Sequence, residues 1–213
     1  MVNKAKKTKI GKVVVCTEDK SILEEVTING GEAILTSNKH KTGTDRIFEA
    51  FKKLEINNID YILNLQGDEP GINEKDIINL NNMMIEKGSD IGTMAAEINT
   101  KLLLKNENAV KVIVEKKLSE KNFPKALNFA RKNILADVKN VYHHIGIYIY
   151  KVSALEKFVN LEQSKNEIEN RLEQLRAIDN DITINVALAK SSPIGVDTKE
   201  DFLAIKKIME YKS

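Results

Sequence analysis

Short apolar runs alternate with amphipathic segments along most of this chain, and this alternation constrains the fold more than any other feature. Runs typical of buried strands occupy residues 13–16, 33–35, 59–63 and 182–188. Segments with helical spacing of apolar residues lie between them, for example at 73–86. This pattern predicts an α/β fold with a mostly parallel sheet and helices on both faces.

Two further strand-like runs, at 109–115 and 126–131, follow one another without an intervening helix. The polar residues 99–108 before them predict irregular structure. Successive strands without a helix indicate a mixed sheet with a small antiparallel excursion. At 213 residues, the chain suits a single domain, 1–213, with a substantial core.

Composition excludes several classes of function. The 33 basic and 31 acidic side chains nearly cancel, so neither a nucleic acid nor an anionic membrane is expected as a partner. The single cysteine, Cys16, excludes an internal disulfide framework and fits a reducing compartment. No apolar stretch reaches the length of a membrane span, and the start lacks the apolar segment of a signal peptide. We therefore expect a cytoplasmic protein.

A polar loop with the sequence Gln-Gly-Asp-Glu-Pro, at 66–70, follows the strand-like run at 59–63. In open α/β sheets, ligands bind just beyond the carboxyl ends of the strands. Asp68 is therefore a candidate metal ligand next to a phosphate site. The same residue types also favour turns, so a simple turn is the alternative.

Asp197 is the second candidate metal ligand. It precedes Thr198, a predicted helix cap, so capping is its structural alternative. Two carboxylates, with phosphate oxygens and water in the remaining positions, are how proteins usually hold Mg²⁺. Asp68 and Asp197 could share such a cation.

A second loop reads Thr-Gly-Thr-Asp-Arg and precedes a predicted amphipathic helix. Thr42, Gly43 and Thr44 offer hydroxyls and open backbone at a helix start, where N–H groups and the helix dipole favour an anion. Arg46 lies one turn further along. Plain capping by Thr44 or Asp45 is the alternative. The sequence contains neither a Walker-type lysine loop nor a G-x-G-x-x-G motif.

Strict alternation over residues 141–150 predicts a strand with two different faces. One face is apolar except for His143. The other face carries His144, Gly146, Tyr148 and two more tyrosines, and we interpret it as a concave polar surface that suits a hydroxylated ligand. His144 and Tyr148 are therefore candidate binding residues, with a structural role as the alternative for a lone histidine.

The residues Ser164 and Glu167 match a capping box and predict the start of a helix. Glu173 and Gln174 lie close to the apolar stripe of this helix, where long polar side chains can line a pocket or an interface. Apolar residues recur at helical spacing at Ile168, Leu172, Leu175 and Ile178.

Five motifs occur in order: Thr-Gly-Thr-Asp-Arg at 42–46, Leu-Gln-Gly-Asp-Glu-Pro at 65–70, His-Ile-Gly-Ile-Tyr at 144–148, Leu-Glu-Gln-Leu-Arg at 172–176 and Gly-Val-Asp-Thr at 195–198. In this order they resemble the 3-deoxy-manno-octulosonate (Kdo) cytidylyltransferases, and the resemblance covers nearly the whole chain. It implies a Rossmann-like nucleotide-diphospho-sugar transferase fold. It also implies a cytoplasmic, Mg²⁺-dependent and usually homodimeric enzyme that activates Kdo with CTP for lipopolysaccharide synthesis.

The resemblance assigns roles to individual residues. It implies that Asp68 and Asp197 hold the catalytic Mg²⁺. The implied reaction is attack of the anomeric hydroxyl of Kdo on the α-phosphorus of CTP with release of pyrophosphate, which depends on positioning and charge neutralisation. Arg131 would suit the sugar carboxylate, because a guanidinium can pair with it bidentately. The implied nucleotide contacts are Thr42, Gly43, Thr44, Arg46 and Gln66, and the implied sugar contacts are Arg131, His144, Tyr148, Glu173 and Gln174.

The sequence also departs from the family. The family opens with a strand and a Pro-Ala-Arg…Arg-Leu-Pro-Gly-Lys-Pro loop that wraps the triphosphate, and residues 1–15 match the part after this loop. We therefore expect the chain to lack roughly one βα unit, on the order of thirty residues. A neighbouring strand should then have an unpaired edge, and pyrophosphate release should be low. The alternatives are an inactive truncated relative with partial ligand binding, or a cytidylyltransferase for another acidic sugar.

Overall fold

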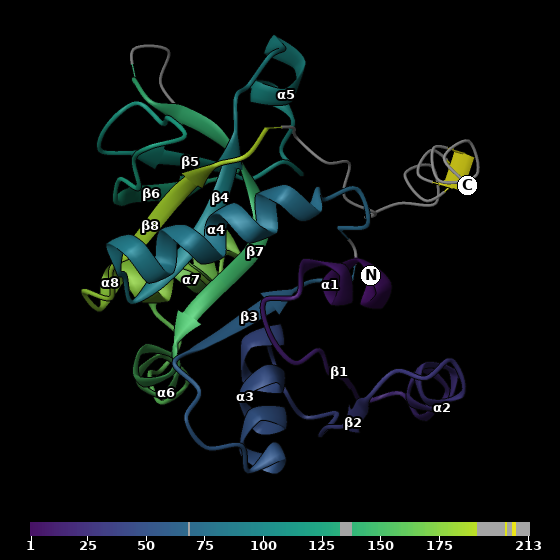
Figure 1. Ribbon diagram of the computed structural model, residues 1–213. Helices are drawn as coiled ribbons and strands as arrows, with labels where there is room; N and C mark the ends of the chain where they lie inside the picture. Colours follow the sequence, from purple (N-terminus) through teal and green to yellow (C-terminus); the bar gives the residue numbers. More distant parts are fainter. Residues whose placement is uncertain (68, 133–137, 191–202, 204–205, 208–213) are drawn as a thin grey trace.

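The structure is a computed structural model that describes residues 1–67, 69–132, 138–190, 203 and 206–207 (Figure 1). Strands and helices alternate through most of the described chain, as the sequence predicts. In chain order they are α1 (Val2–Thr8), β1 (Val15–Thr17), α2 (Lys20–Ile28), β2 (Ala33–Leu35), α3 (Gly43–Leu54), β3 (Tyr61–Leu65), α4 (Glu74–Lys87), β4 (Ile91–Ala96), α5 (Lys101–Lys105), β5 (Lys111–Val114), β6 (Ala126–Ala130), β7 (Val141–Lys151), α6 (Val152–Val159), α7 (Lys165–Asn170), α8 (Leu175–Asp179) and β8 (Ile184–Leu188).

The long strand β7 organises the main sheet. This sheet has the order β6-β5-β7-β4-β8, and β3 also pairs with β7. The strands β3, β4 and β5 all run antiparallel to β7, whereas β8 is parallel to β4. The mixed sheet and the antiparallel β5–β6 excursion are therefore confirmed. The described strands β3, β4, β5 and β8 of this sheet share one direction, as a mostly parallel sheet predicts, and β7 and β6 run opposite to them.

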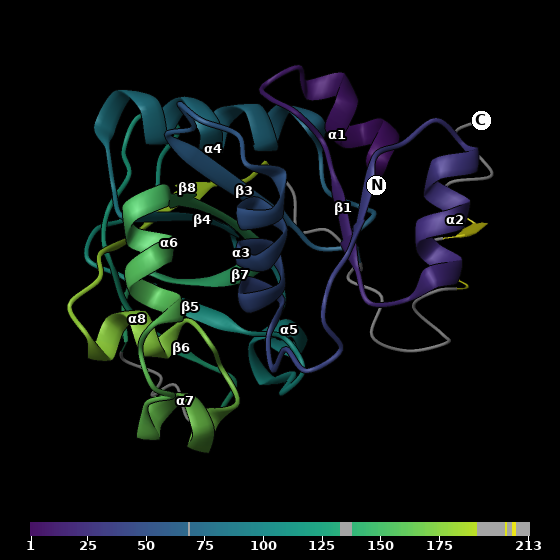
Figure 2. The ribbon, with the colours of Figure 1, turned by 90° about the horizontal axis from the view of Figure 1, so that it is seen from below.

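The strands β1 and β2 form a separate, two-stranded parallel sheet. Together with α2 they lie to one side of the main sheet (Figure 2). Among the described strands, β1 pairs only with β2, and β3 pairs only with β7. One edge of β3 therefore has no strand partner in this part of the chain.

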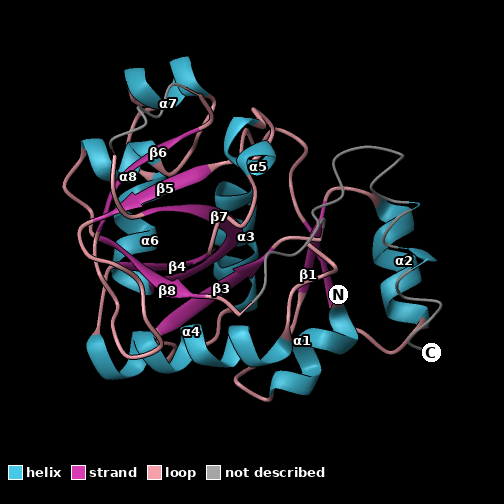
Figure 3. Ribbon diagram, turned by 90° about the horizontal axis from the view of Figure 1, so that it is seen from above, coloured by secondary structure: helices cyan, strands magenta, loops and turns pink. Residues whose placement is uncertain are grey.

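Two apolar clusters cover the two faces of the main sheet, with helices on both sides as predicted (Figure 3). The isoleucines of β7 pack in one cluster with α4, and the tyrosines of β7 pack in the other with α6 and α8. The face of β7 that was expected to be a concave polar surface is largely buried. His144 is only 7% exposed and Tyr148 only 8%, because tyrosine rings bring enough apolar area to join a core.

Two local predictions also need correction. Residues 99–108 contain the short helix α5, which Thr100 caps by accepting a hydrogen bond from the Leu103 amide. The single helix expected after Ser164 is two short helices, because Arg171 adopts a left-handed conformation with φ 53° and ends α7. Ile168, predicted to be buried, is 60% exposed. No helix in the described ranges is both long and apolar enough to cross a membrane.

Candidate functional site

The candidate site lies where β3 ends, α3 begins and β7 runs beside both. Asn64 pairs in register with Tyr148 and the next residue of β3 pairs with Ile147, so Gln66 follows at the level of Gly146. The start of α3 comes to the same place, since a Cβ on Gly43 would lie 4.0 Å from the side-chain nitrogen Nδ2 of Asn64. Three segments that are distant in the sequence therefore meet at one point.

The start of α3 is capped by Thr42. Its hydroxyl oxygen accepts a hydrogen bond from the Asp45 amide at 3.2 Å, so the cap is Thr42 and neither Thr44 nor Asp45, the residues of the capping alternative. The amides of Gly43 and Thr44 lie in the first turn, where N–H groups have no acceptor within the helix. Such a helix start favours an anion.

A buried chain of polar groups connects α3 to β7 and to the turn between α7 and α8. The Thr44 hydroxyl lies 3.3 Å from the Tyr150 hydroxyl and donates to Glu173 Oε2 at 3.0 Å. The ring of Tyr150 lies 5.9 Å from that of Tyr148, which in turn lies 5.4 Å from the imidazole of His144. Three predicted sugar contacts, on β7 and in the turn, therefore belong to one continuous group.

Glu173 is the most unusual member of this group. Its Oε1 atom is buried and has no hydrogen-bond partner among the described residues. Burial raises the pKa of Glu173 more than the hydroxyls of Thr42 and Thr44 lower it. Buried acceptors without a partner are rare because they lose their hydration without compensation. Glu173 is therefore suited to accept a hydrogen bond from a ligand.

His144 is held in one neutral form. The Thr93 hydroxyl donates to the Ile147 carbonyl at 2.7 Å, so His144 Nε2–H donates to the Thr93 oxygen at 2.9 Å. Burial, with a smaller effect from the His143 charge, lowers the pKa of His144 to about 3. The imidazole is therefore neutral near pH 7, and its Nδ1 atom can accept a hydrogen bond.

Gly146 allows the loop after β3 to approach β7. A Cβ at this position would lie 3.2 Å from Gln66 Oε1 and 3.5 Å from Glu69 Oε1. The Gly146 amide also donates to Glu69 Oε1 at 3.4 Å. Glu69, Asn64, Thr93 and Tyr150 are not among the site residues predicted from the sequence. Only Glu69 and Tyr150 had a signal there, one within the loop motif and the other on the tyrosine face of the strand.

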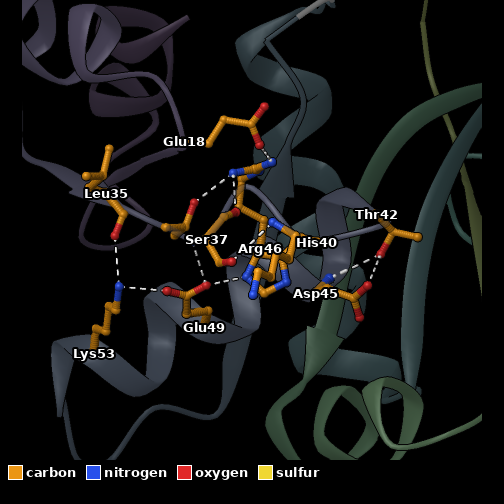
Figure 4. A network of polar contacts seen from close by, with 11 residues as sticks. Glu18, Leu35, Ser37, His40, Thr42, Asp45, Arg46, Glu49 and Lys53 are labelled. Atoms are coloured by element: carbon orange, nitrogen blue, oxygen red, sulfur yellow. Dashed lines mark hydrogen bonds and ion pairs between the residues drawn. The ribbon is translucent and has the colours of Figure 1, made fainter.

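Two predicted binding residues make other contacts in the structure. The guanidinium of Arg46 pairs with Glu18 and donates to the Thr36 hydroxyl at 2.8 Å (Figure 4). Arg131 follows β6, and its guanidinium donates to the Asn108 carbonyl at 2.9 Å. Both cations are thus engaged with the protein itself.

The remaining predicted site residues are Gln174, Asp68 and Asp197. Gln174 is the N-cap residue of α8 and adjoins Glu173 in the turn. Asp68 and Asp197, the predicted metal ligands, lie outside the described residues. Among the side chains that the structure does describe, no group of three or more His, Cys, Asp or Glu could hold a metal ion.

The family model and the relatives that this chain matches are all cytidylyltransferases. A family model described as cytidylyltransferase matches residues 1–184. The chain is 38% identical over 210 residues to a 3-deoxy-manno-octulosonate cytidylyltransferase of Bartonella tribocorum, covering 98% of this chain and 86% of that protein. The corresponding protein of Afipia carboxidovorans is 39% identical, with 98% of this chain and 84% of that protein covered.

Solved structures extend the comparison to three dimensions. A CMP:2-keto-3-deoxy-manno-octonic acid synthetase complexed with CTP has a TM-score of 0.84 and 29% identity, covering 100% of this chain and 88% of that one. A UDP-glucose pyrophosphorylase complexed with UDP-glucose has a TM-score of 0.72 at 14% identity, covering 100% of this chain and 85% of that one. At this lower identity the likeness shows the fold alone.

Proposed function

We propose a function from one premise: this chain belongs to the cytidylyltransferase family. Its curated relatives at 38% and 39% identity are 3-deoxy-manno-octulosonate cytidylyltransferases. The chain is accordingly a CTP-dependent nucleotidyltransferase. Its reaction is transfer of CMP from CTP to the anomeric hydroxyl of Kdo, with release of pyrophosphate, in lipopolysaccharide biosynthesis.

The buried group around Glu173 is the observation that best supports a sugar site. A sugar presents many hydroxyl donors, and both Glu173 Oε1 and the Nδ1 atom of neutral His144 can accept from them. Tyr148 and Gln174 adjoin these two acceptors along β7 and the α7–α8 turn. We assign the hydroxylated part of Kdo to this group, and its carboxylate to Arg131, which would exchange the Asn108 carbonyl for the ligand.

The nucleotide is assigned to the neighbouring start of α3 and to the end of β3. The first-turn amides of Gly43 and Thr44 would face phosphate or base oxygens, and Gln66 would contribute an amide from the β3 loop. Thr42 and Arg46 support this segment from either side. Holding both substrates in line supplies much of the catalysis in phosphoryl-type transfers, since no covalent intermediate is required.

Mg²⁺ is the proposed cofactor, with Asp68 and Asp197 as its protein ligands. Carboxylate oxygens are the donors that Mg²⁺ prefers, so the chemistry of this pair fits the ion. Bound there, the ion would neutralise charge that develops on the phosphate oxygens. We also propose a homodimer on the basis of the family, and a cytoplasmic location because the one cysteine fits a reducing compartment.

An assay of product formation tests the activity. The chain is incubated with CTP, Kdo and Mg²⁺. We expect it to release pyrophosphate and form CMP-Kdo, detected by mass spectrometry, only when all three are present.

Substitution of each substrate separates the alternatives. UTP in place of CTP should give no product. Turnover with a sialic acid instead of Kdo would favour a cytidylyltransferase for another acidic sugar. Binding of CTP without turnover of any acidic sugar would favour an inactive relative. Sedimentation velocity measures the proposed dimer in the same samples.

A further inference from the structure

The helix α3 carries a stripe of three charged residues, Arg46, Glu49 and Lys53, that faces the segment connecting β2 to α3 (Figure 4). Residues spaced by three and four positions lie on one face of a helix. The connecting segment, residues 36–42, ends at the proposed nucleotide contacts. The stripe therefore contacts the very segment that leads into the candidate site.

Glu49 fixes this segment at two points. Its Oε2 atom accepts a hydrogen bond from the Ser37 amide at 2.9 Å and also pairs with His40 Nε2. Its other oxygen, Oε1, pairs with Lys53 Nζ at 2.6 Å, and Lys53 in turn donates to the Leu35 carbonyl at 2.9 Å. One carboxylate thus joins the beginning and the middle of the segment to the helix.

Arg46 and Thr42 complete the attachment. Arg46 donates to the Thr36 hydroxyl at 2.8 Å and to the Ser37 carbonyl at 3.4 Å, while Thr42 caps the helix at the far end of the segment. Hydrogen bonds from Lys53, Ser37 and His40 lower the pKa of Glu49 to about 2. The carboxylate is therefore charged at every pH at which the enzyme would be assayed.

We propose that Glu49 is a positioning residue for nucleotide binding: by holding Ser37 and His40 against α3, it keeps the 36–42 segment in the shape that presents Thr42–Thr44 to CTP. This inference rests on the proposed function, because it takes the start of α3 as a nucleotide contact. Without Glu49, the segment would have to be ordered when CTP binds, and affinity would fall by the cost of that ordering. Glu49 itself would touch no substrate.

Three variants test the proposal. Glu49→Ala removes the carboxylate, Glu49→Gln keeps an oxygen that can accept from the Ser37 amide, and Lys52→Ala is the matched control. Lys52 lies on the same helix, and its surface pair with Glu156, at 3.7 Å, does not involve the segment. Isothermal titration calorimetry measures the affinity of each protein for CTP and, separately, for Kdo. Hydrogen exchange monitored by mass spectrometry measures protection of residues 36–42 and of β7.

The expected effects differ between variants and ligands. Glu49→Ala should weaken CTP binding about tenfold, and Glu49→Gln about threefold, because only the first removes both acceptor atoms. Lys52→Ala should change it less than about twofold, as exposed pairs contribute little. Affinity for Kdo should stay unchanged in all three. Exchange should accelerate at residues 36–42 in Glu49→Ala while β7 keeps its protection.

Two results would overturn the proposal while leaving the proposed function intact. One is unchanged CTP affinity in Glu49→Ala. The other is an equal loss of CTP and Kdo affinity with faster exchange in β7, which would mean general destabilisation. Failure of the unsubstituted chain to bind CTP would instead refute the proposed function, and this inference with it.

Discussion

Acidification should destabilise the folded chain through His144. The pKa of this buried imidazole is lowered to about 3, whereas the unfolded chain has a histidine pKa of about 6.5. The unfolded state therefore takes up the proton first as the pH falls. The free energy of unfolding therefore has its full value, as far as His144 is concerned, above pH 6.5. It falls progressively between about pH 6.5 and pH 3.

The magnitude follows from the interval between the two pKa values. Each pH unit within the window costs about 1.4 kcal/mol, so a change from pH 7 to pH 5 should lower the free energy of unfolding by about 2 kcal/mol through His144 alone. The matched variant is His144→Gln. Its amide nitrogen can donate to the Thr93 hydroxyl in place of Nε2, and it does not titrate.

Urea denaturation of both proteins at pH 7 and pH 5 measures the effect. The unsubstituted chain should lose about 2 kcal/mol more than His144→Gln over this interval. Contributions from His143 and from the carboxyl groups occur in both proteins and cancel in the difference. Equal pH dependence of the two proteins would refute the reasoning, because it would mean that the folded state tolerates a charged His144.

Two further substitutions test the packing and the site. Glu167→Ala should lower the free energy of unfolding, measured by urea denaturation, by about 3–5 kcal/mol, because it leaves Arg176 buried without its bidentate partner at 2.7 and 2.6 Å. The double variant with Arg176→Met should lose less stability, and an equal or larger loss would contradict this. Gly146→Ala should weaken CTP binding with little change in melting temperature, because its methyl group would displace the flexible end of Gln66. Unchanged CTP affinity in calorimetry would argue against Gln66 as a nucleotide contact.

Local chemistry made parts of this fold predictable. The alternation over 141–150 located β7 (Val141–Lys151) almost completely, and the capping box at Ser164 and Glu167 marked the start of α7 correctly. The break between α7 and α8 was not predictable in this way, because Arg171 has no special preference for the left-handed region. Local patterns indicate only which conformation a residue prefers, and the conformation of Arg171 differs from that preference.

The site shows the same limit more clearly. Alternation divides β7 into two faces but does not say what covers each face, so it predicts a concave polar surface where the structure has a largely buried tyrosine face. The contacts that define the site join residues 106 and 129 positions apart, from Thr44 to Tyr150 and to Glu173. In the sequence, only the resemblance carried by the five ordered motifs indicates that these segments belong to one site.

The buried group of His144, Tyr148, Tyr150 and Glu173 consists of side chains that resist carrying charge. Burial raises the pKa of Tyr148, Tyr150 and Glu173 and lowers that of His144. Such a surface suits neutral hydroxyl groups and would reject a phosphate, because a buried charge without a partner is costly. The charges of the triphosphate and of the sugar carboxylate must then be met elsewhere: at the start of α3, by Arg131, and by the proposed metal. Arg46 is not needed for these charges. It can therefore keep its contacts with Glu18 and Thr36, which hold the 36–42 segment against α3.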